Sequence, residues 1–185
     1  MALLFNTGKI MKEMKFIHVP TYFAGALALL LGFAPLSGQA ADKFPQGKDY
    51  PVSEIYKGKP AEHIDNSDEF THMFRTRFKE AMQGDVAFAG EYAQAGWGCG
   101  GSGCHVVAFI NKRTGRALDK AFSVYYGGDN DEVTIGEDIV YMDKNSKLLV
   151  TSGMDEITNK FYSYYYVLKG NKLELILKSE RKEEE

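Results

Sequence analysis

Both cysteines and the only tryptophan of this chain lie within one short segment, Trp97–His105. The four residues between Cys99 and Cys104 are three glycines and one serine. Glycine lets the backbone turn back on itself, so the two Cβ atoms can approach to disulfide distance. A bridge across so short a loop contributes roughly 2 kcal/mol by the chain-entropy estimate. The sequence therefore predicts a small fixed loop between two strands, which either pins those strands together or is presented for recognition.

The first forty residues have the order of a secretory signal peptide. Lys9, Lys12 and Lys15 precede an uncharged apolar run over residues 22–36, and small residues then lead to Ala40. The run has 15 residues, fewer than the roughly 20 that a membrane-spanning helix needs. We therefore expect cleavage after Ala40, a protein of the periplasm or a secreted one, and no stable membrane span afterwards.

Export limits the chemistry that the chain can carry. Removing residues 1–40 takes away three Lys and one Glu, which changes the formal net charge from −3 to −5. A mildly acidic domain lacks the electrostatic footprint of a nucleic-acid-binding protein. In an oxidising compartment Cys99 and Cys104 form a disulfide by default. Their spacing is not Cys-x-x-Cys, and only His105 lies nearby as a third metal ligand, so we expect no redox centre, no metal and no cofactor.

Four segments follow from composition. They are a signal peptide at 1–40, a loosely packed arm rich in Pro, Gly and Lys at 41–63, a single domain at 64–178, and a charged disordered tail at 179–185.

The domain has one helical pattern followed by several strand patterns. Apolar residues at helical spacing predict one helix over Ser67–Gln83, with Asn66 and Glu69 as a capping pair. Short apolar runs between turn residues predict strands at 86–95, 105–111, 116–126, 138–142, 147–153, 161–168 and 173–177. We therefore expect an α+β fold, with one N-terminal helix packed on a meandering antiparallel sheet of six to seven strands.

The residues around the cysteines are the candidate contact residues. Tyr92 and Trp97 have side chains with large apolar area and a polar handle, which suits a binding surface and equally suits packing on the disulfide. The loop residues between the two cysteines and His105, which follows Cys104, are the other candidates. The predicted contact set is Tyr92, Trp97, Gly100, Gly101, Ser102, Gly103 and His105. No nucleophile, P-loop or dinucleotide motif occurs, so no catalytic residue is predicted.

Two other features leave alternatives open. Strand alternation over 161–167 places Tyr162, Tyr164 and Tyr166 on one face, where they could bind a sugar or a protein or lie under the N-terminal arm. An acidic cluster has the carboxylates that Ca²⁺ prefers but lacks EF-hand spacing, which favours a solvated loop. Its members are Asp129, Asp131, Glu132, Glu137 and Asp138.

One part of the chain resembles a known group. The stretch Phe88–Tyr92, followed by Trp97–Gly100 and Cys104, resembles a widespread group of bacterial exported proteins of unassigned function. Those proteins carry Phe-Ala-Gly-His-Tyr, then Trp-Gly-Cys-Gly and a second Cys. This chain has Glu91 where they have His. The resemblance covers roughly residues 85–177, including the hairpin at 111–116 and the strand residues 147–150.

A weaker similarity is to the Ivy-type periplasmic inhibitors of vertebrate lysozyme. That similarity implies an α+β protein that presents a Cys-bracketed loop to an enzyme cleft. The loop of those inhibitors carries a His between its two Cys, whereas His105 lies just outside the bracket here. The similarity therefore implies a shape and not an inhibitory residue.

These observations predict an exported, non-enzymatic binding protein of the inhibitor or immunity type. Its partner would be another protein, such as an envelope enzyme or a toxin, and its contact the disulfide-fixed loop. Two alternatives are a cell-envelope enzyme, either a hydrolase or a redox helper, and a structural or solute-binding module. The last would have a deep pocket lined by Tyr164 or Tyr166.

Overall fold

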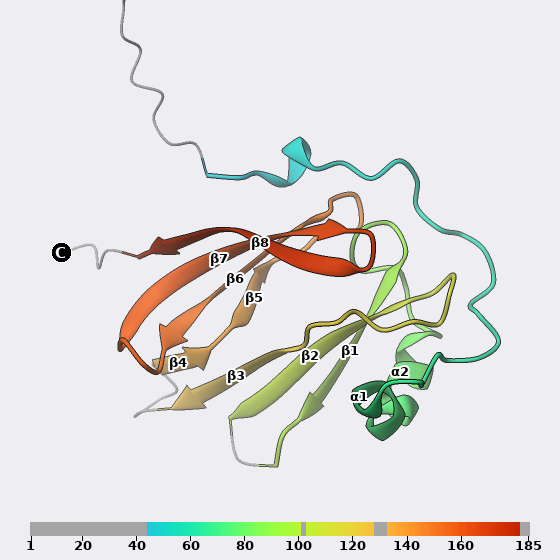
Figure 1. Cartoon of the computed structure of the whole chain (residues 1–185), viewed down its shortest axis with the longest axis horizontal. Coiled ribbons are helices and arrows are strands. Elements are labelled where there is room, and N and C mark those ends of the chain that lie inside the picture. Colours follow the sequence, from blue (N-terminus) through green and yellow to red (C-terminus); the bar gives the residue numbers. More distant parts are fainter. Residues whose placement is uncertain (1–43, 101–102, 128–132, 182–185) are drawn as a thin grey trace, which may run out of the picture. The chain divides into compact units, whose positions relative to one another are not determined.

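One mixed sheet of eight strands dominates the part of the chain that the computed structural model describes, residues 44–100, 103–127 and 133–181 (Figure 1). The strands are β1 (Tyr92–Gly98), β2 (Cys104–Asn111), β3 (Phe122–Gly127), β4 (Val133–Gly136), β5 (Asp138–Tyr141), β6 (Leu148–Asp155), β7 (Lys160–Lys169) and β8 (Lys172–Glu180). Two short helices, α1 (Glu69–Met73) and α2 (Arg75–Ala81), precede them. The sheet-rich α+β class is therefore confirmed, and the predicted signal peptide at 1–40 lies outside the described residues.

The single helix expected over Ser67–Gln83 is instead a pair. The chain leaves helical geometry at Phe74, with φ −101° and ψ 17°, which separates α1 from α2. Asp68, and not Asn66, caps the first helix, because its Oδ1 accepts from the Thr71 amide at 2.8 Å. Neither helix within the described ranges is long and apolar enough to cross a membrane.

The strand order is β1-β2-β3-β4-β6-β7-β8, with β5 also paired to β6. All neighbouring pairs are antiparallel except β4 and β6, which run parallel where Ile135 faces Met154. The expected all-antiparallel meander of six to seven strands was wrong in this respect and in the number of strands. Short β4 joins an antiparallel half, β1–β3, to another, β6–β8.

The strand boundaries differ from those expected, most of all at the starts of the first and third strands. The first strand begins at Tyr92 instead of Val86, because Ala89 (φ 48°) and Gly90 (φ 80°) turn the chain sharply. The strand expected from Arg116 begins at Phe122. The last strand runs to Glu180, which pairs with Tyr162, so residues 179 and 180, expected in the tail, belong to the sheet. Residues 182–185 lie outside the described ranges.

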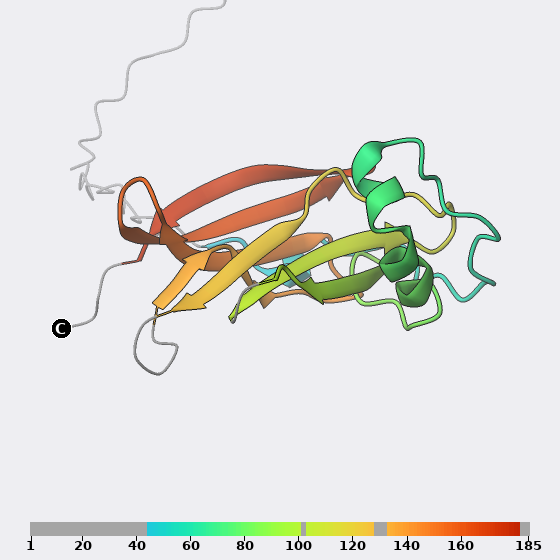
Figure 2. The same cartoon turned by 90° about the horizontal axis from the view of Figure 1, so that it is seen from below.

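Apolar side chains pack on both faces of the sheet. On the inner face, β2 and β3 meet β6 and β7 through a cluster that includes Phe109, Phe122 and Leu149. On the opposite face of β1 and β2, a second cluster contains Phe78 of α2 and Met82 at its C-terminal end, and Phe70 of α1 packs against it. Figure 2 shows α1 and α2 beside these two strands. The sheet is therefore buried on both faces over much of β1 and β2.

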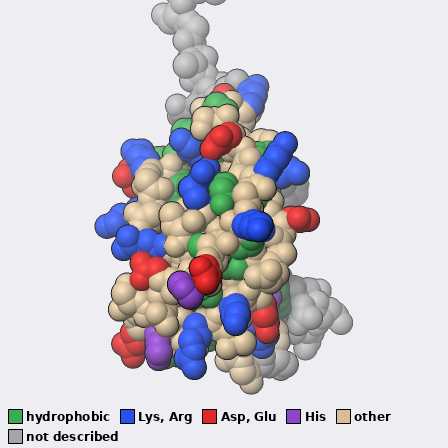
Figure 3. Space-filling model, turned by 90° about the vertical axis from the view of Figure 1, so that its right-hand side faces the viewer, with side chains coloured by type: hydrophobic (Ala, Val, Ile, Leu, Met, Phe, Trp, Pro, Cys, Tyr) green, Lys and Arg blue, Asp and Glu red, His purple; other side chains and the backbone are tan. Residues whose placement is uncertain are grey.

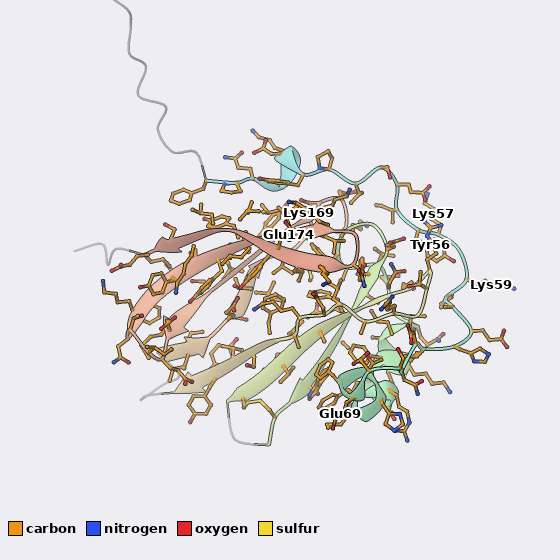
Figure 4. The ribbon with its side chains drawn as sticks, viewed as in Figure 1. Tyr56, Lys57, Lys59, Glu69, Lys169 and Glu174 are labelled. Atoms are coloured by element: carbon orange, nitrogen blue, oxygen red, sulfur yellow. A yellow bond between two sulfur atoms is a disulfide. The ribbon has the colours of Figure 1, made fainter. Side chains whose placement is uncertain are left out.

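The N-terminal arm is held along its length, in contrast to the loose packing expected. Its backbone amides donate to loops of the domain: Val52 to the Asn145 carbonyl at 3.0 Å, and Ala61 to the Lys112 carbonyl at 2.8 Å. Tyr56 lies between them, where its hydroxyl donates to the Lys59 carbonyl at 2.7 Å (Figure 4). Pairing with distant loops decides this packing, and composition does not reveal it.

Candidate functional site

A disulfide between Cys99 and Cys104 closes the end of the β1–β2 hairpin. Their Cα atoms are 5.3 Å apart, and the preceding register pairs Gly98 with His105. The amide of Cys99 donates to the carbonyl of Cys104 at 3.4 Å, so the ladder continues as far as the bridge. Figure 4 shows the bond at the end of this hairpin, apart from the two helices. The predicted disulfide is confirmed, and it pins two neighbouring strands.

The described loop residues are exposed, and the two legs of the loop are held differently. Gly103 has φ +80°, its carbonyl accepts from the Tyr126 amide at 2.9 Å, and a Cβ there would clash with the Tyr126 carbonyl. Gly100 has φ +98°, but a Cβ there would meet nothing within 4 Å. The Gly103 side of the loop is therefore packed on β3, and the Gly100 side faces solvent. The predicted contact residues Gly101 and Ser102 lie outside the described residues.

We expect Gly103→Ala to lower the free energy of unfolding by about 2–3 kcal/mol, because it adds a steric clash to an unfavourable φ. Gly100→Ala is the matched control, since it has the unfavourable φ without the clash, and should cost about 1 kcal/mol. Urea denaturation followed by circular dichroism measures both. Equal losses in the two variants would show that contact with β3 does not hold the loop.

His105 and Tyr125 flank the disulfide on opposite faces of the sheet. Tyr125 pairs with Cys104 in the β2–β3 register and is 45 % exposed. The exposed imidazole of His105 lies on the other face, where a Cβ at Gly96 would stand 3.3 Å from its Cε1 and Nε2 atoms. Sequence reasoning missed Tyr125. We define the hairpin-end surface as Cys99, Gly100, Cys104, His105 and Tyr125.

The two aromatic residues predicted to contribute to this surface are buried. Trp97 is 9 % exposed, and its ring stacks on Phe74 at a centroid distance of 4.4 Å. The rings of Phe70 and Phe78 also lie against this indole, each with a centroid distance of 6.1 Å. Tyr92 is 1 % exposed and belongs to the inner-face cluster. These side chains hold the hairpin in place by packing in the core, and they are too buried to contact a partner directly.

Glu91 stabilises the turn after β2. Its Oε1 accepts from Asn111 Nδ2 at 2.7 Å, and its Oε2 accepts from Arg113 Nε at 3.0 Å. The same guanidinium donates to Glu54 at 2.8 Å and lies over the Tyr56 ring at 4.5 Å. Glu91 and Arg113 together therefore link the arm to the turn, at the end of the hairpin opposite the disulfide.

A second polar cluster lies on the inner face around Glu137. One of its oxygens accepts from Lys120 Nζ at 3.1 Å, and the other accepts from Thr151 Oγ1 at 2.6 Å and Tyr166 Oη at 2.7 Å. Burial, with the hydrogen bond to this carboxylate, raises the pKa of the Tyr166 hydroxyl. Both carboxylate oxygens of Glu137 therefore accept hydrogen bonds, and this geometry suits a side chain that holds neighbouring strands together.

The acidic cluster, for which a solvated loop was expected, is only partly within the described residues, since Asp129, Asp131 and Glu132 lie outside them. Burial, and after it the hydrogen bond to Asp138, raise the pKa of the Tyr126 hydroxyl. Across the described ranges, no three His, Cys, Asp or Glu side chains are grouped as metal ligands would be.

The tyrosine strand has the alternation expected of it. Tyr162, Tyr164 and Tyr166 pair with Gly153, Thr151 and Leu149 and share the inner face. The ammonium of Lys178 lies over two of these rings, 4.0 Å from the centroid of Tyr162 and 5.1 Å from that of Tyr164. The arm covers the other face, where Phe44 stacks on Tyr165 at 5.8 Å. Of the two possibilities for the three tyrosines, cover by the arm is therefore excluded.

Comparisons with known proteins give no relative. No family model, no curated protein and no solved structure matches this chain. The fold and the site define a sheet-rich α+β domain with one disulfide at the exposed end of a hairpin.

Proposed function

We propose that this chain is an exported, non-enzymatic binding protein that contacts another protein through the hairpin-end surface. The observation that carries the proposal is the exposure of the disulfide-closed end, with Tyr125 beside the bridge. Binding surfaces gain affinity when they are fixed before the partner arrives, because less conformational freedom is lost on association. The bridge and the packing of Gly103 on β3 supply that fixation.

The chemistry of the surface favours a protein partner. Tyr125 offers a large amphipathic ring with only two rotatable side-chain bonds, which is a common anchor at protein interfaces. The described loop glycines, Gly100 and Gly103, carry no side chain, so a partner can approach the backbone closely. Each of the polar groups around Glu137 has a partner, so they offer less support for an enzyme.

The proposed location and partner class follow from the sequence. The signal-peptide pattern at 1–40 and the disulfide support a periplasmic or secreted protein. An envelope enzyme or a toxin is the partner we propose, with the chain as inhibitor or immunity-type factor. The Ivy-type similarity supports the same geometry, in which a Cys-bracketed hairpin end enters a cleft.

Site-specific photo-crosslinking tests the contact. A photoreactive residue is placed at Tyr125 and, as the control, at Ile157, which is 92 % exposed in the turn after β6. In the exported chain, we expect a discrete crosslinked protein from position 125 and none from position 157. The same products from both positions, or none from position 125, would contradict the proposal.

Affinity for the crosslinked partner then tests the residue itself. Tyr125→Ala should weaken binding at least tenfold, about 1.4 kcal/mol, whereas Ile157→Ala should leave it unchanged. Calorimetric titration of the purified pair measures both values.

A further inference from the structure

A pocket of about 690 Å³ lies between the arm residues 61–66 and helix α2. Its volume is in the range of small-molecule sites, which run from roughly 300 to 1,000 Å³. It shares no residue with the hairpin-end surface, so an inference about it does not depend on the proposed function. We call it the arm–helix pocket.

Both walls of the arm–helix pocket are fixed. On the arm side, the amides of Ala61 and Asp65 donate to the carbonyls of Lys112 and Gly115 at 2.8 and 2.9 Å. On the helix side, Phe78 and Met82 are 0 % and 2 % exposed and anchor α2 in the core. The pocket is therefore formed before any ligand arrives, which reduces the entropy cost of binding.

The helix wall presents two cations to the pocket. Arg75 and Lys79 are four residues apart on α2, which puts them on the same helix face, and both line the pocket. Arg75 Nη1 donates to the His72 carbonyl at 3.2 Å, which orients the guanidinium and leaves other N–H groups for a ligand. Figure 3, which faces this side of the molecule, shows histidine and basic side chains interspersed with acidic ones on its lower part.

The arm wall adds hydrogen-bonding groups. His63 and Asn66 lie on this wall, and Glu62 is the one carboxylate among the described residues that line the pocket. Gln83 contributes an amide from the turn after α2, and the buried Met82 supplies apolar surface. The pocket thus combines a cationic pair with neutral donors and acceptors.

We propose that the arm–helix pocket binds a small phosphorylated ligand of the size of a sugar phosphate. The phosphate lies on Arg75 and Lys79, because its oxygens can accept from a guanidinium fork and an ammonium together. The neutral hydroxyl-bearing part lies against Asn66 and Gln83, whose amides both donate and accept.

Nitrogen–proton correlation spectra of the exported, disulfide-bonded chain test this proposal. Glucose 6-phosphate is the probe, with glucose and glucuronate as neutral and carboxylate controls at constant ionic strength. We expect saturable shifts of the amides in 61–66 and 75–83 with the phosphate ester, and at least tenfold weaker binding of both controls. Binding of glucuronate equal to that of glucose 6-phosphate would overturn the assignment to a phosphate, and shifts no larger than those with glucose would overturn the site.

Two variants locate the binding on the cations. Lys79→Ala should weaken glucose 6-phosphate binding at least tenfold. Arg77→Ala is the matched control, because Arg77 lies on the same helix, pairs with Glu80 at 3.3 Å and does not line the pocket. Equal effects of the two substitutions, or none from Lys79→Ala, would overturn the proposal. Both side chains are exposed, so each variant should fold, and its spectrum reports directly whether it does.

Discussion

Replacing Trp97 by alanine is expected to lower the free energy of unfolding by about 3–5 kcal/mol, the usual cost of deleting a buried aromatic side chain. The indole is 9 % exposed and stacks on Phe74, while Phe70 and Phe78 contact it from the same helical layer. Its removal leaves a cavity between the helices and β1. Because the variant lacks tryptophan fluorescence, urea denaturation is followed by far-ultraviolet circular dichroism.

Tyr125→Ala is the matched control for this prediction. Tyr125 is also aromatic and also near the disulfide, but it is 45 % exposed. We expect its removal to change stability by no more than about 0.5 kcal/mol while it weakens partner binding. If Trp97→Ala leaves stability unchanged and weakens binding instead, the indole acts as a contact, as the sequence pattern suggested.

The features that local sequence determines were predicted well. The disulfide follows from two cysteines separated by glycines, and the structure confirms it. The turn at 112–115 follows from its glycine, which has φ +72°. The shared face of Tyr162, Tyr164 and Tyr166 follows from the two-residue period of a strand, although that period does not reveal that it is the inner face. Each of these depends on neighbours within a few residues, which is the range over which a sequence pattern is informative.

Local sequence patterns could not predict which residues of the candidate site are exposed. Alternation puts Trp97 on one face of β1, but only the packing of α1 and α2 decides that this face is covered. Tyr125 was missed for a related reason. Its neighbours Phe122 and Val124 are buried, at 2 % and 4 % exposed, so alternation indicates an outward position once the buried face of β3 is known. The expected strand began at Arg116, six residues before β3 does, and an even offset leaves that alternation unchanged, so what was missing is which face the core covers.

The parallel contact between β4 and β6 was also beyond sequence reasoning, because it joins segments that no turn connects directly. Two glycines meet there: a Cβ at Gly153 would clash with the carbonyl of Gly136, and a Cβ at Gly136 would clash with the carbonyl of Ser123. Backbones approach this closely only where side chains are absent. The antiparallel halves of the sheet are therefore joined through a contact that a single methyl group would obstruct.

We expect Gly153→Ala to lower the free energy of unfolding by about 3 kcal/mol, at the upper end of the cost of overpacking. Its φ is not in the left-handed region, so the loss would come from contact with Gly136 and not from backbone strain. Gly98→Ala is the matched control: it is also a strand glycine, and its Cβ would stand 3.7 Å from the nearest carbonyl oxygen, at ordinary contact distance. That change should alter stability by less than about 1 kcal/mol.

Amide hydrogen exchange separates this cause from a general loss of stability. If the added methyl group forces β4 from β6, the amides of residues 134–136 should lose protection before those of β7 and β8, whose pairing does not involve Gly136. Uniform loss of protection, or a stability equal to that of Gly98→Ala, would show that the contact between the two glycines does not hold the halves of the sheet together. Selective loss at β4 would show that this one parallel contact joins the hairpin end to the tyrosine strand.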